Sequence, residues 1–560
     1  MIRGADIVVR SLIAENAEYI FGYPGGAIMP VYDALYDYSD QIKHVLTRHE
    51  QGAVHAAQGY ARVSGKVGVA LATSGPGATN LITGLADALI DSTPLVCITG
   101  QVAAHLLGTD AFQETDMVGL SMPGTKWNIQ VRSVADIAPA IAKGFHIARS
   151  GRPGPVLIDI TKNAQVEFGE FNYTPCHKIR SYRPHVEIRQ PDIESAAALI
   201  NSAEKPFLLY GQGVVIGQAE AELTRFLDKT GIPAACTLLG SGALPESHPS
   251  YVGKLGMHGN YAPNMLTNQC DVLIAVGMRF DDRVTGDLKR YAKQAKVIHL
   301  ELDPAEIDKN VKSTVAILGD CKLSLAKLVD AVRPNAHQEW MQRFRELESQ
   351  EREAVMSKDL HATHGGLHMG EVIHLINQYK EDDAVLVTDV GQHQMIAWRY
   401  FDYRTTRSQV TSGGLGTMGF ALPAALGAQL HNYKRQVICV VGDGGIQMTI
   451  QELGTIMQTK APVKIVLLNN NYLGMVRQWQ QMFFDKRYSF TELENPDFIK
   501  IAEAYQIRSL KVTERADLGA AIAEMLLHDG AFFLEVVVEK EDNVFPMIAT
   551  GCSVEEVRLS

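Results

Sequence analysis

Asp443 and Asn470 are the residues whose types and spacing most suggest chemistry. The first stands in a glycine-bounded turn, Gly442-Asp443-Gly444, and the second completes the pair Asn469-Asn470. A carboxylate and an amide oxygen held side by side suit a Mg²⁺ ion that also holds substrate phosphates. A lone G-D-G tripeptide is usually only a turn, so its meaning depends on the elements around it.

The segments around these residues predict a strand, a helix and a second strand. The apolar run Gln436–Val441 ends abruptly at the glycines, as a buried strand would. Met448–Lys460 carries apolar residues at helical spacing before Pro462, and Val463–Leu468 is a second apolar run. Strands joined in this way are parallel, so both candidate residues should lie at the carboxyl edge of one sheet, where ligands of such sheets bind.

Glu50 is a second candidate, in the first third of the chain. It opens an alanine-rich helical segment, where a glutamate usually serves only as a favourable neighbour of the helix dipole. The glycine-rich segment Thr73–Asn80 precedes another helix and could hold an anion. It lacks the lysine of a P-loop and the G-x-G-x-x-G spacing, so a purely structural turn is the alternative. The residues alone leave both alternatives open.

Composition narrows the class of protein. The chain has 560 residues, of which 46% are hydrophobic and 21% charged, as in ordinary globular proteins of several domains. Its net charge of −11 argues against nucleic acid or an anionic membrane as the main partner. The seven cysteines are scattered without a C-x-x-C pair, which indicates buried thiols in a reducing compartment. No apolar run reaches transmembrane length, and we expect a cytoplasmic protein.

Strand and helix patterns alternate along the chain and predict an α/β fold. We expect three domains, at residues 1–165, 190–335 and 365–545. Strands of the middle domain end in glycines and in the acids Glu301 and Asp303, which suits a nucleotide-binding domain. No G-x-G-x-x-G motif is present, so the spacing alone leaves open whether this domain binds a nucleotide. A charged helical segment near residues 335–358 should connect the second and third domains.

Six motifs occur together in one chain. They are G-Y-P-G-G-A (22–27), R-H-E-Q (48–51), S-G-P-G-A-T-N (74–80), D-A-F-Q-E (110–114), S-G-R-P-G-P-V (150–156) and the G-D-G…N-N unit (442–470). Together they resemble the catalytic large subunits of acetohydroxyacid (acetolactate) synthases, and the resemblance covers nearly the whole chain. It implies three doubly wound parallel-sheet domains of the pyruvate oxidase-like type, which bind the thiamine diphosphate (ThDP) pyrimidine, FAD and the ThDP diphosphate with Mg²⁺.

The activity that the resemblance implies is a carboligation. Pyruvate is decarboxylated on ThDP, and the two-carbon fragment is joined to a second pyruvate or to 2-ketobutyrate, giving 2-acetolactate or 2-aceto-2-hydroxybutyrate on the route to branched-chain amino acids. The resemblance also implies a homodimer or homotetramer and a small regulatory subunit. Glu50 would hydrogen-bond the aminopyrimidine ring; in an apolar slot, a glutamate favours its protonated form and can share that proton.

The resemblance implies the following site residues. The catalytic group comprises Glu50, Gly26, Phe112, Gln113, Lys162, Met418 and Trp479, the last a selectivity device for the larger 2-ketoacid. ThDP would contact Glu50, Pro76, Asn80, Gly391, Gln392, His393, Gly416, Met418, Gly442, Gly444, Gly445, Leu473, Gly474 and Met475. The metal ligands would be Asp443, Asn470 and the carbonyl of Tyr472. FAD would contact Arg152, Gly211, Thr237, Leu238, Leu255, Gly256, Met257, His258, Gly277, Arg279, Asp281, Arg283, Glu301, Asp303, Gly319 and Asp320.

Phe112 without its motif would be assigned to a hydrophobic core. The family often has serine where this chain has Gly445.

Two alternatives share the scaffold: a pyruvate oxidase, which would reduce its flavin, and a glyoxylate carboligase, which lacks the glutamate that this chain has at Glu50. A third alternative is a non-catalytic scaffold; intact Glu50, Asp443 and Asn470 speak against it.

Overall fold

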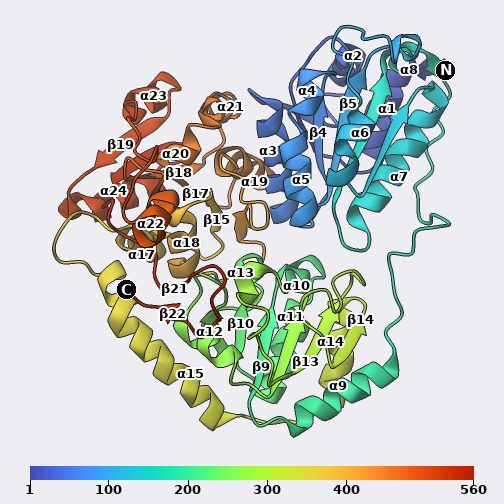
Figure 1. Cartoon of the computed structure of the whole chain (residues 1–560). Helices are drawn as coiled ribbons and strands as arrows, with labels where there is room; N and C mark the ends of the chain where they lie inside the picture. The colour runs from blue at the N-terminus through green and yellow to red at the C-terminus, as the bar shows by residue number, and fades with distance from the viewer.

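The structure is a computed structural model that describes residues 1–560. It contains three α/β units, each built on a six-stranded sheet whose neighbouring strands are all parallel (Figure 1). In Figure 1 the N-terminal unit is blue to cyan, the central unit green, and the C-terminal unit orange to red. The predicted α/β class with three parallel sheets is confirmed.

In each sheet the spatial order of the strands differs from their order along the chain. From edge to edge, the N-terminal sheet contains β3 (Lys43–Leu46), β2 (Tyr19–Gly22), β4 (Gly68–Ala72), β5 (Leu95–Gln101), β7 (Pro155–Thr161) and β6 (Trp127–Val131). The central sheet contains β11 (Tyr251–Lys254), β10 (Ala234–Cys236), β9 (Pro206–Tyr210), β12 (Val272–Val276), β13 (Lys296–Glu301) and β14 (Val315–Leu318). The C-terminal sheet contains β16 (Gln409–Thr411), β15 (Val385–Thr388), β17 (Val437–Gly442), β18 (Lys464–Asn469), β20 (Phe532–Val537) and β19 (Arg508–Val512).

The strand–helix–strand unit predicted from the G-D-G turn is present. β17 and β18 are adjacent, parallel and buried along their whole length, as continuous apolar runs require. The helix between them is shorter than the pattern suggested. The chain first makes α20 (Asp443–Ile446) and a 3₁₀ turn, and α21 (Leu453–Thr459) begins only there. Thr449 interrupts the expected helix because its hydroxyl donates to the carbonyl of Gly419 (2.8 Å).

The N-terminal and C-terminal units pack directly on each other. Helix α3 (Glu50–Ser64) lies against α19 (Ala421–His431), and one hydrophobic core runs through both units. Glycine permits this contact: a β-carbon at Gly59 would overlap the carbonyl of Ala424, and one at Gly427 would overlap that of Ala56. The helix that begins with Glu50 is therefore fixed against the C-terminal unit of its own chain.

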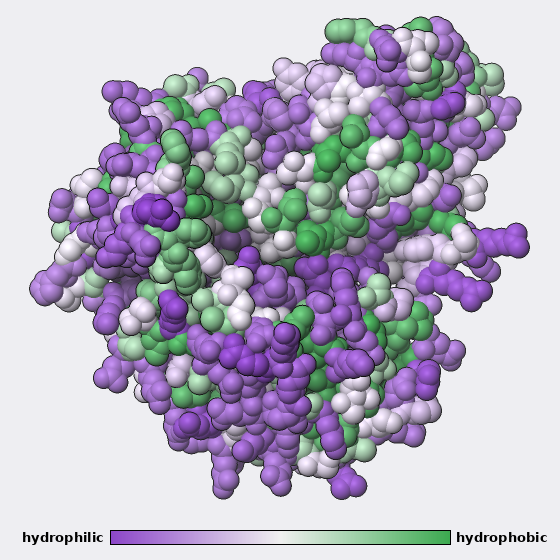
Figure 2. Space-filling view, in the orientation of Figure 1, coloured by the Kyte–Doolittle hydropathy of each residue, from purple (hydrophilic) through white to green (hydrophobic).

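The central unit is connected to the C-terminal unit by α15 (Gln338–Glu351), at the edge of the molecule in Figure 1. The predicted connecting helix is present, and its buried face contains Trp340, Phe344 and Leu347. The chain end returns to the central unit, where the Ile548 amide donates to the Met257 carbonyl (2.9 Å). In Figure 2, polar residues cover most of the visible face, and apolar ones gather near the centre, where the units approach one another. None of the helices is long and apolar enough to cross a membrane.

Candidate active site

The carboxyl ends of β15, β17 and β18 surround a small cavity in the C-terminal unit. Asp443 follows β17 and is 2% exposed, and Asn470 follows β18 and is also buried. The cavity has a volume of ≈ 60 Å³. Its lining includes all the residues of this unit that the resemblance assigns to ThDP and the metal except Gly416: Gly391, Gln392, His393, Met418, Gly442, Asp443, Gly444, Gly445, Asn470, Tyr472, Leu473, Gly474 and Met475.

The polar atoms around this cavity fit a phosphate–metal group. Burial raises the pKa of the Asp443 carboxyl to about 6, so a nearby cation would stabilise its ionised form. The side-chain oxygen of Asn470 accepts from the Tyr472 amide (3.1 Å). The Nε2 atom of His393 is buried without a partner, and desolvation lowers the pKa of this ring to about 3. A neutral imidazole facing a lined cavity can supply a hydrogen bond to a ligand.

Gly445 occupies the position at which the resembling family often has serine. A β-carbon there would overlap the carboxylate of Asp389, which is fully buried. That carboxylate accepts from the backbone amides of Val390 (2.9 Å) and Gly419 (3.0 Å). Glycine at this position thus leaves room for Asp389, which fixes the loop that carries Met418.

The N-terminal unit brings Glu50 together with the glycine-rich segment. Glu50 begins α3 and is 8% exposed, and its Oε2 accepts from the side-chain amide of Asn80 (2.9 Å). Gly77 lies against the other oxygen, since a β-carbon there would be 3.0 Å from Oε1. A β-carbon on Gly75 would be 2.9 Å from that of Gln113, so the D-A-F-Q-E loop packs on the same turn. One oxygen of this carboxylate thus has a specific hydrogen-bond partner. A glutamate that only interacts with the helix dipole would not need one.

Residues of the two groups do not line the same cavity. Glu50, Gly26, Pro76, Asn80, Phe112, Gln113 and Lys162 line neither the small cavity nor the larger cavity at the junction of the three units. Phe112 is 88% exposed, so its assignment to a core, the default without the motif, is wrong. The predicted residues therefore form two separate clusters, one in each terminal unit.

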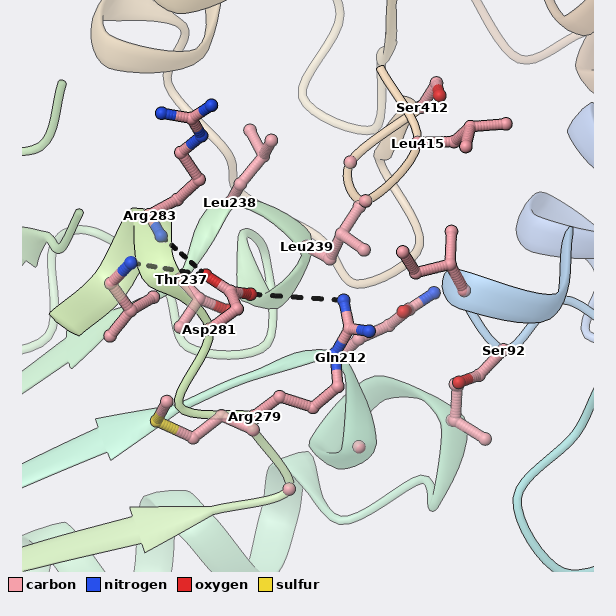
Figure 3. Close-up of a pocket in the computed structure, with 18 of the residues that line it drawn as sticks. Ser92, Gln212, Thr237, Leu238, Leu239, Arg279, Asp281, Arg283, Ser412 and Leu415 are labelled. Carbon is pink, nitrogen blue, oxygen red and sulfur yellow. Dashed lines mark hydrogen bonds and ion pairs between the residues drawn. The ribbon is translucent and has the colours of Figure 1, made fainter. Parts of the chain in front are cut away.

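The larger cavity, of ≈ 1040 Å³, lies where the three units meet (Figure 3). Its lining also includes Gly416, Met418 and Trp479, and it shares Met418 and Met475 with the small cavity. Of the residues proposed for FAD, Gly211, Asp303 and Gly319 do not line it. The others do: Arg152, Thr237, Leu238, Leu255, Gly256, Met257, His258, Gly277, Arg279, Asp281, Arg283, Glu301 and Asp320.

Charged side chains are fixed around this cavity. Asp281 caps the short helix α13 (Asp282–Thr285) by accepting from the amides of Arg283 (3.1 Å) and Val284 (3.2 Å), and it lies 4.0 Å from Arg279 (Figure 3). Burial raises the pKa of Asp281. On the side of the N-terminal unit, the Arg152 guanidinium pairs with Asp303 (3.1 Å).

The shape and polarity of the large cavity fit a dinucleotide. Gly277 has φ +55°, and a β-carbon there would be 2.7 Å from the Cα of Gly213, so backbone forms this part of the wall. The Nδ1 atom of His258 is buried without a partner. Exposed backbone and a free ring nitrogen are features that a phosphate-bearing cofactor can use.

Several supporting residues had no signal strong enough to be found from the sequence. Glu452, in the C-terminal unit, accepts from the backbone amide of Arg48 (3.0 and 3.2 Å) just before Glu50. Asp91 of the N-terminal unit accepts from the amides of Gly413 and Gly414 (both 2.8 Å), which precede Gly416 and Met418. Asp91 directly follows the helix α5 (Ile82–Ile90), and nothing in the local sequence distinguishes it from a surface acid.

Comparisons with known proteins agree on one kind of protein. The thiamine pyrophosphate enzyme N-terminal TPP binding domain matches residues 2–120, the central domain 193–328, and the C-terminal TPP binding domain 389–536. The chain is 46% identical to the acetolactate synthase isozyme 2 large subunit of Escherichia coli (strain K12), over 99% of each chain. It is 44% identical to the acetolactate synthase large subunit of Corynebacterium glutamicum, over 99% of this chain and 90% of that one. It is 42% identical to the probable acetolactate synthase large subunit of Methanocaldococcus jannaschii, over 98% and 94%.

Proposed function

The chain belongs to the acetolactate synthase large subunits, a family of thiamine pyrophosphate enzymes, and on that premise we propose the reaction and the residues that carry it. It decarboxylates pyruvate and joins the two-carbon fragment to a second pyruvate or to 2-ketobutyrate. The observation that carries this proposal is the border between the two cavities, where Met418 and Met475 line both and Trp479 lines the larger. Residues around the proposed diphosphate site thus also line the end of the larger cavity next to Trp479, where the 2-ketoacids would bind beside the flavin.

The C-terminal unit would hold the cofactor's diphosphate. Asp443, Asn470 and the Tyr472 carbonyl would bind Mg²⁺, and the backbone around Gly391 and the His393 ring would contact phosphate oxygens. Carboxylate, amide and carbonyl oxygens are the ligands that Mg²⁺ prefers, together with substrate phosphates. When bound, thiamine diphosphate supplies the carbanion and the electron sink for decarboxylation.

Glu50 would hold and move the proton at the aminopyrimidine ring. The hydrogen bond from Asn80 occupies Oε2, so Oε1 is the oxygen left to face the aminopyrimidine ring. Phe112 and Gln113 lie on the loop that packs against the same glycine-rich turn, and they would approach the second substrate. Trp479 would select 2-ketobutyrate over pyruvate by contact with one extra methylene, which is worth about 1–3 kcal/mol.

The separation of the two residue clusters supports a site shared between two copies of the chain. Glu50 from one copy would act on the cofactor held by Asp443 of the other, in a homodimer or a tetramer built from such dimers. FAD would occupy the large cavity and stabilise the junction of the three units, since carboligation transfers no electrons to it. The relatives are named large subunits, and we propose a small regulatory subunit as a further partner.

The test is product analysis with ThDP, Mg²⁺ and FAD supplied. Pyruvate alone should give acetolactate, and a mixture with 2-ketobutyrate should give mainly acetohydroxybutyrate. Acetate or acetyl phosphate with reduced flavin would instead identify a pyruvate oxidase. Absence of turnover with bound cofactors would favour the non-catalytic scaffold.

A further inference from the structure

A short segment, Thr491–Asn495, runs beside the turn that carries the proposed metal ligands. The amide of Leu473 donates to the carbonyl of Thr491 (2.8 Å), and the amide of Leu493 donates to the carbonyl of Asn471 (2.8 Å). Between these two bonds, Tyr472 and Glu492 form an antiparallel bridge. The backbone of the metal-binding turn is therefore held along one side by this segment, which we call the strap.

The strap ends at Asn495, whose side chain reaches the ends of both central strands. Its Nδ2 donates to Oδ2 of Asp443 (2.7 Å), after β17, and to the side-chain oxygens of Asn471 (3.1 Å) and Asn469 (3.2 Å), at β18. Its own oxygen accepts from Nε2 of Gln447 (3.0 Å). One amide thus joins the two strand ends whose separation decides whether a single ion can contact both.

Asn469, the acceptor on β18, is itself held by a further hydrogen bond. Asn469 donates through Nδ2 to Oε1 of Glu535 (2.9 Å), which leaves its oxygen to face Asn495. Glu535 is 1% exposed and pairs with Lys511 (3.1 Å). Since a side-chain amide has one donor end and one acceptor end, the buried carboxylate sets the orientation of Asn469. The contact with Asn495 is therefore part of a continuous network.

We propose that Asn495 is a positioning residue for the divalent cation. By binding Oδ2 of Asp443, it leaves Oδ1 for the ion, and by joining both strand ends it fixes the distance between Asp443 and Asn470. Mg²⁺ demands near-ideal octahedral geometry, so a small loss of ligand order should weaken binding strongly. Groups that orient metal ligands typically contribute about 10–100-fold to metal affinity. This inference rests on the proposed function, because it assumes the metal site there.

The test compares the Mg²⁺ dependence of ThDP binding in three proteins. Asn495→Ala removes the amide, and Glu492→Ala, a change on the same strap at a side chain that makes no contact with Asp443, is the matched control. Full-length apoprotein at fixed ThDP is titrated with MgCl₂, with quenching of intrinsic fluorescence as the signal. Asn495→Ala should raise the Mg²⁺ concentration for half-saturation by about 10–100-fold. Saturating Mg²⁺ should restore ThDP binding and kcat.

Two further results decide the matter. A half-saturating Mg²⁺ concentration equal to that of wild type and Glu492→Ala would overturn the role of Asn495 while leaving the metal site in place. ThDP binding by wild type that needs no divalent ion would overturn the proposed metal site and this inference with it. If Asn495→Ala does not fold, Asn495→Ser keeps a polar side chain too short to span both strand ends, and the same change in half-saturation is expected.

Discussion

In the C-terminal unit, Asp443 lies in a cavity whose walls come from that same unit, whereas in the N-terminal unit Glu50 lies beside a loop that exposes Phe112. Each acid is oriented in the same way. Asn495 donates to Oδ2 of Asp443 and Asn80 donates to Oε2 of Glu50, which leaves the other oxygen of each for a ligand. The two acids therefore do not differ in how a neighbouring amide orients them. They differ in whether the surrounding cavity is formed by the same chain. The half proposed to hold the cofactor is therefore enclosed within one chain, whereas the half that carries Glu50 is proposed to act on a second copy.

The largest expected effect comes from substituting Glu50 in one chain and Asp443 in the other. Glu50→Gln and Asp443→Asn should each lower kcat by about 10²–10⁴-fold, because one removes the proton carrier and the other a metal ligand. A heterodimer of the two variants, purified through two different tags, should recover about half of the wild-type activity, since one of its two shared sites carries neither substitution.

The control for this experiment is each variant purified with both tags on the same substitution. These homodimers should stay inactive at the same cofactor concentrations. If the heterodimer is as inactive as its parents, the two clusters act within one chain, and the comparison between a closed and an open half no longer holds.

Removing the amide beside Glu50 should have the next largest effect. A hydrogen bond to an ionisable group is worth about 1.5–3 kcal/mol, so Asn80→Ala should lower kcat by about 10–100-fold. If Asn80 acts through Glu50, the dissociation constant of ThDP stays unchanged. Thr79→Ala is the matched control, since that hydroxyl only donates to the nearby carbonyl of Pro76 (3.1 Å). A weaker ThDP complex with unchanged kcat would instead make Asn80 a cofactor contact, as the sequence resemblance implied.

The sequence allowed the C-terminal half to be predicted because its information is local. β17, its turn and β18 form one consecutive segment, so apolar runs and glycines were enough to place Asp443 and Asn470 at one edge of the sheet. The residues proposed for FAD were assigned by motif, and most of them line one cavity. Gly211, Asp303 and Gly319 do not line this cavity. A motif match gives a residue's position along the chain, but it does not show whether that residue faces the cavity.

What could not be predicted depends on contacts between distant segments. Glu452 binds the amide of Arg48 across 404 positions of sequence, and Asp91 binds Gly413 across 322. Neither acid has a spacing that distinguishes it from a surface residue. Asn495 lies in a segment whose sequence has no strand or helix pattern, so nothing local indicates that it joins two strand ends. The exposure of Phe112 likewise had no local signal, since an aromatic residue is by default assigned to a core.

The proposed role of Trp479 can be tested by measuring substrate selectivity. Trp479 lines the large cavity, and its ring lies 5.1 Å from that of Phe483, centroid to centroid. Trp479→Leu should lower the ratio of acetohydroxybutyrate to acetolactate by roughly 10-fold in a substrate mixture, within the 1–3 kcal/mol that one methylene contributes. Phe483→Leu, which does not line the cavity, should change the ratio far less. An unaltered ratio in Trp479→Leu would place the selective contact elsewhere.

The support of the loop that carries Phe112 should depend on pH. Burial raises the pKa of Asp159 to about 6, and its Oδ2 accepts from Gln101 (3.0 Å), whose amide also donates to the carbonyl of Thr115 behind the Phe112 loop. The folded state therefore keeps this proton to a higher pH than the unfolded chain does. Its contribution to the free energy of unfolding is fully present below about pH 4 and is lost as pH rises to about 6, by on the order of 3 kcal/mol. Asp159→Asn should remove this dependence, so urea denaturation between pH 5 and 7 should show the variant gaining stability relative to wild type as pH rises. The exposed Asp37→Asn should follow wild type throughout, and an Asp159→Asn curve parallel to wild type would mean that this carboxyl ionises normally in the folded chain.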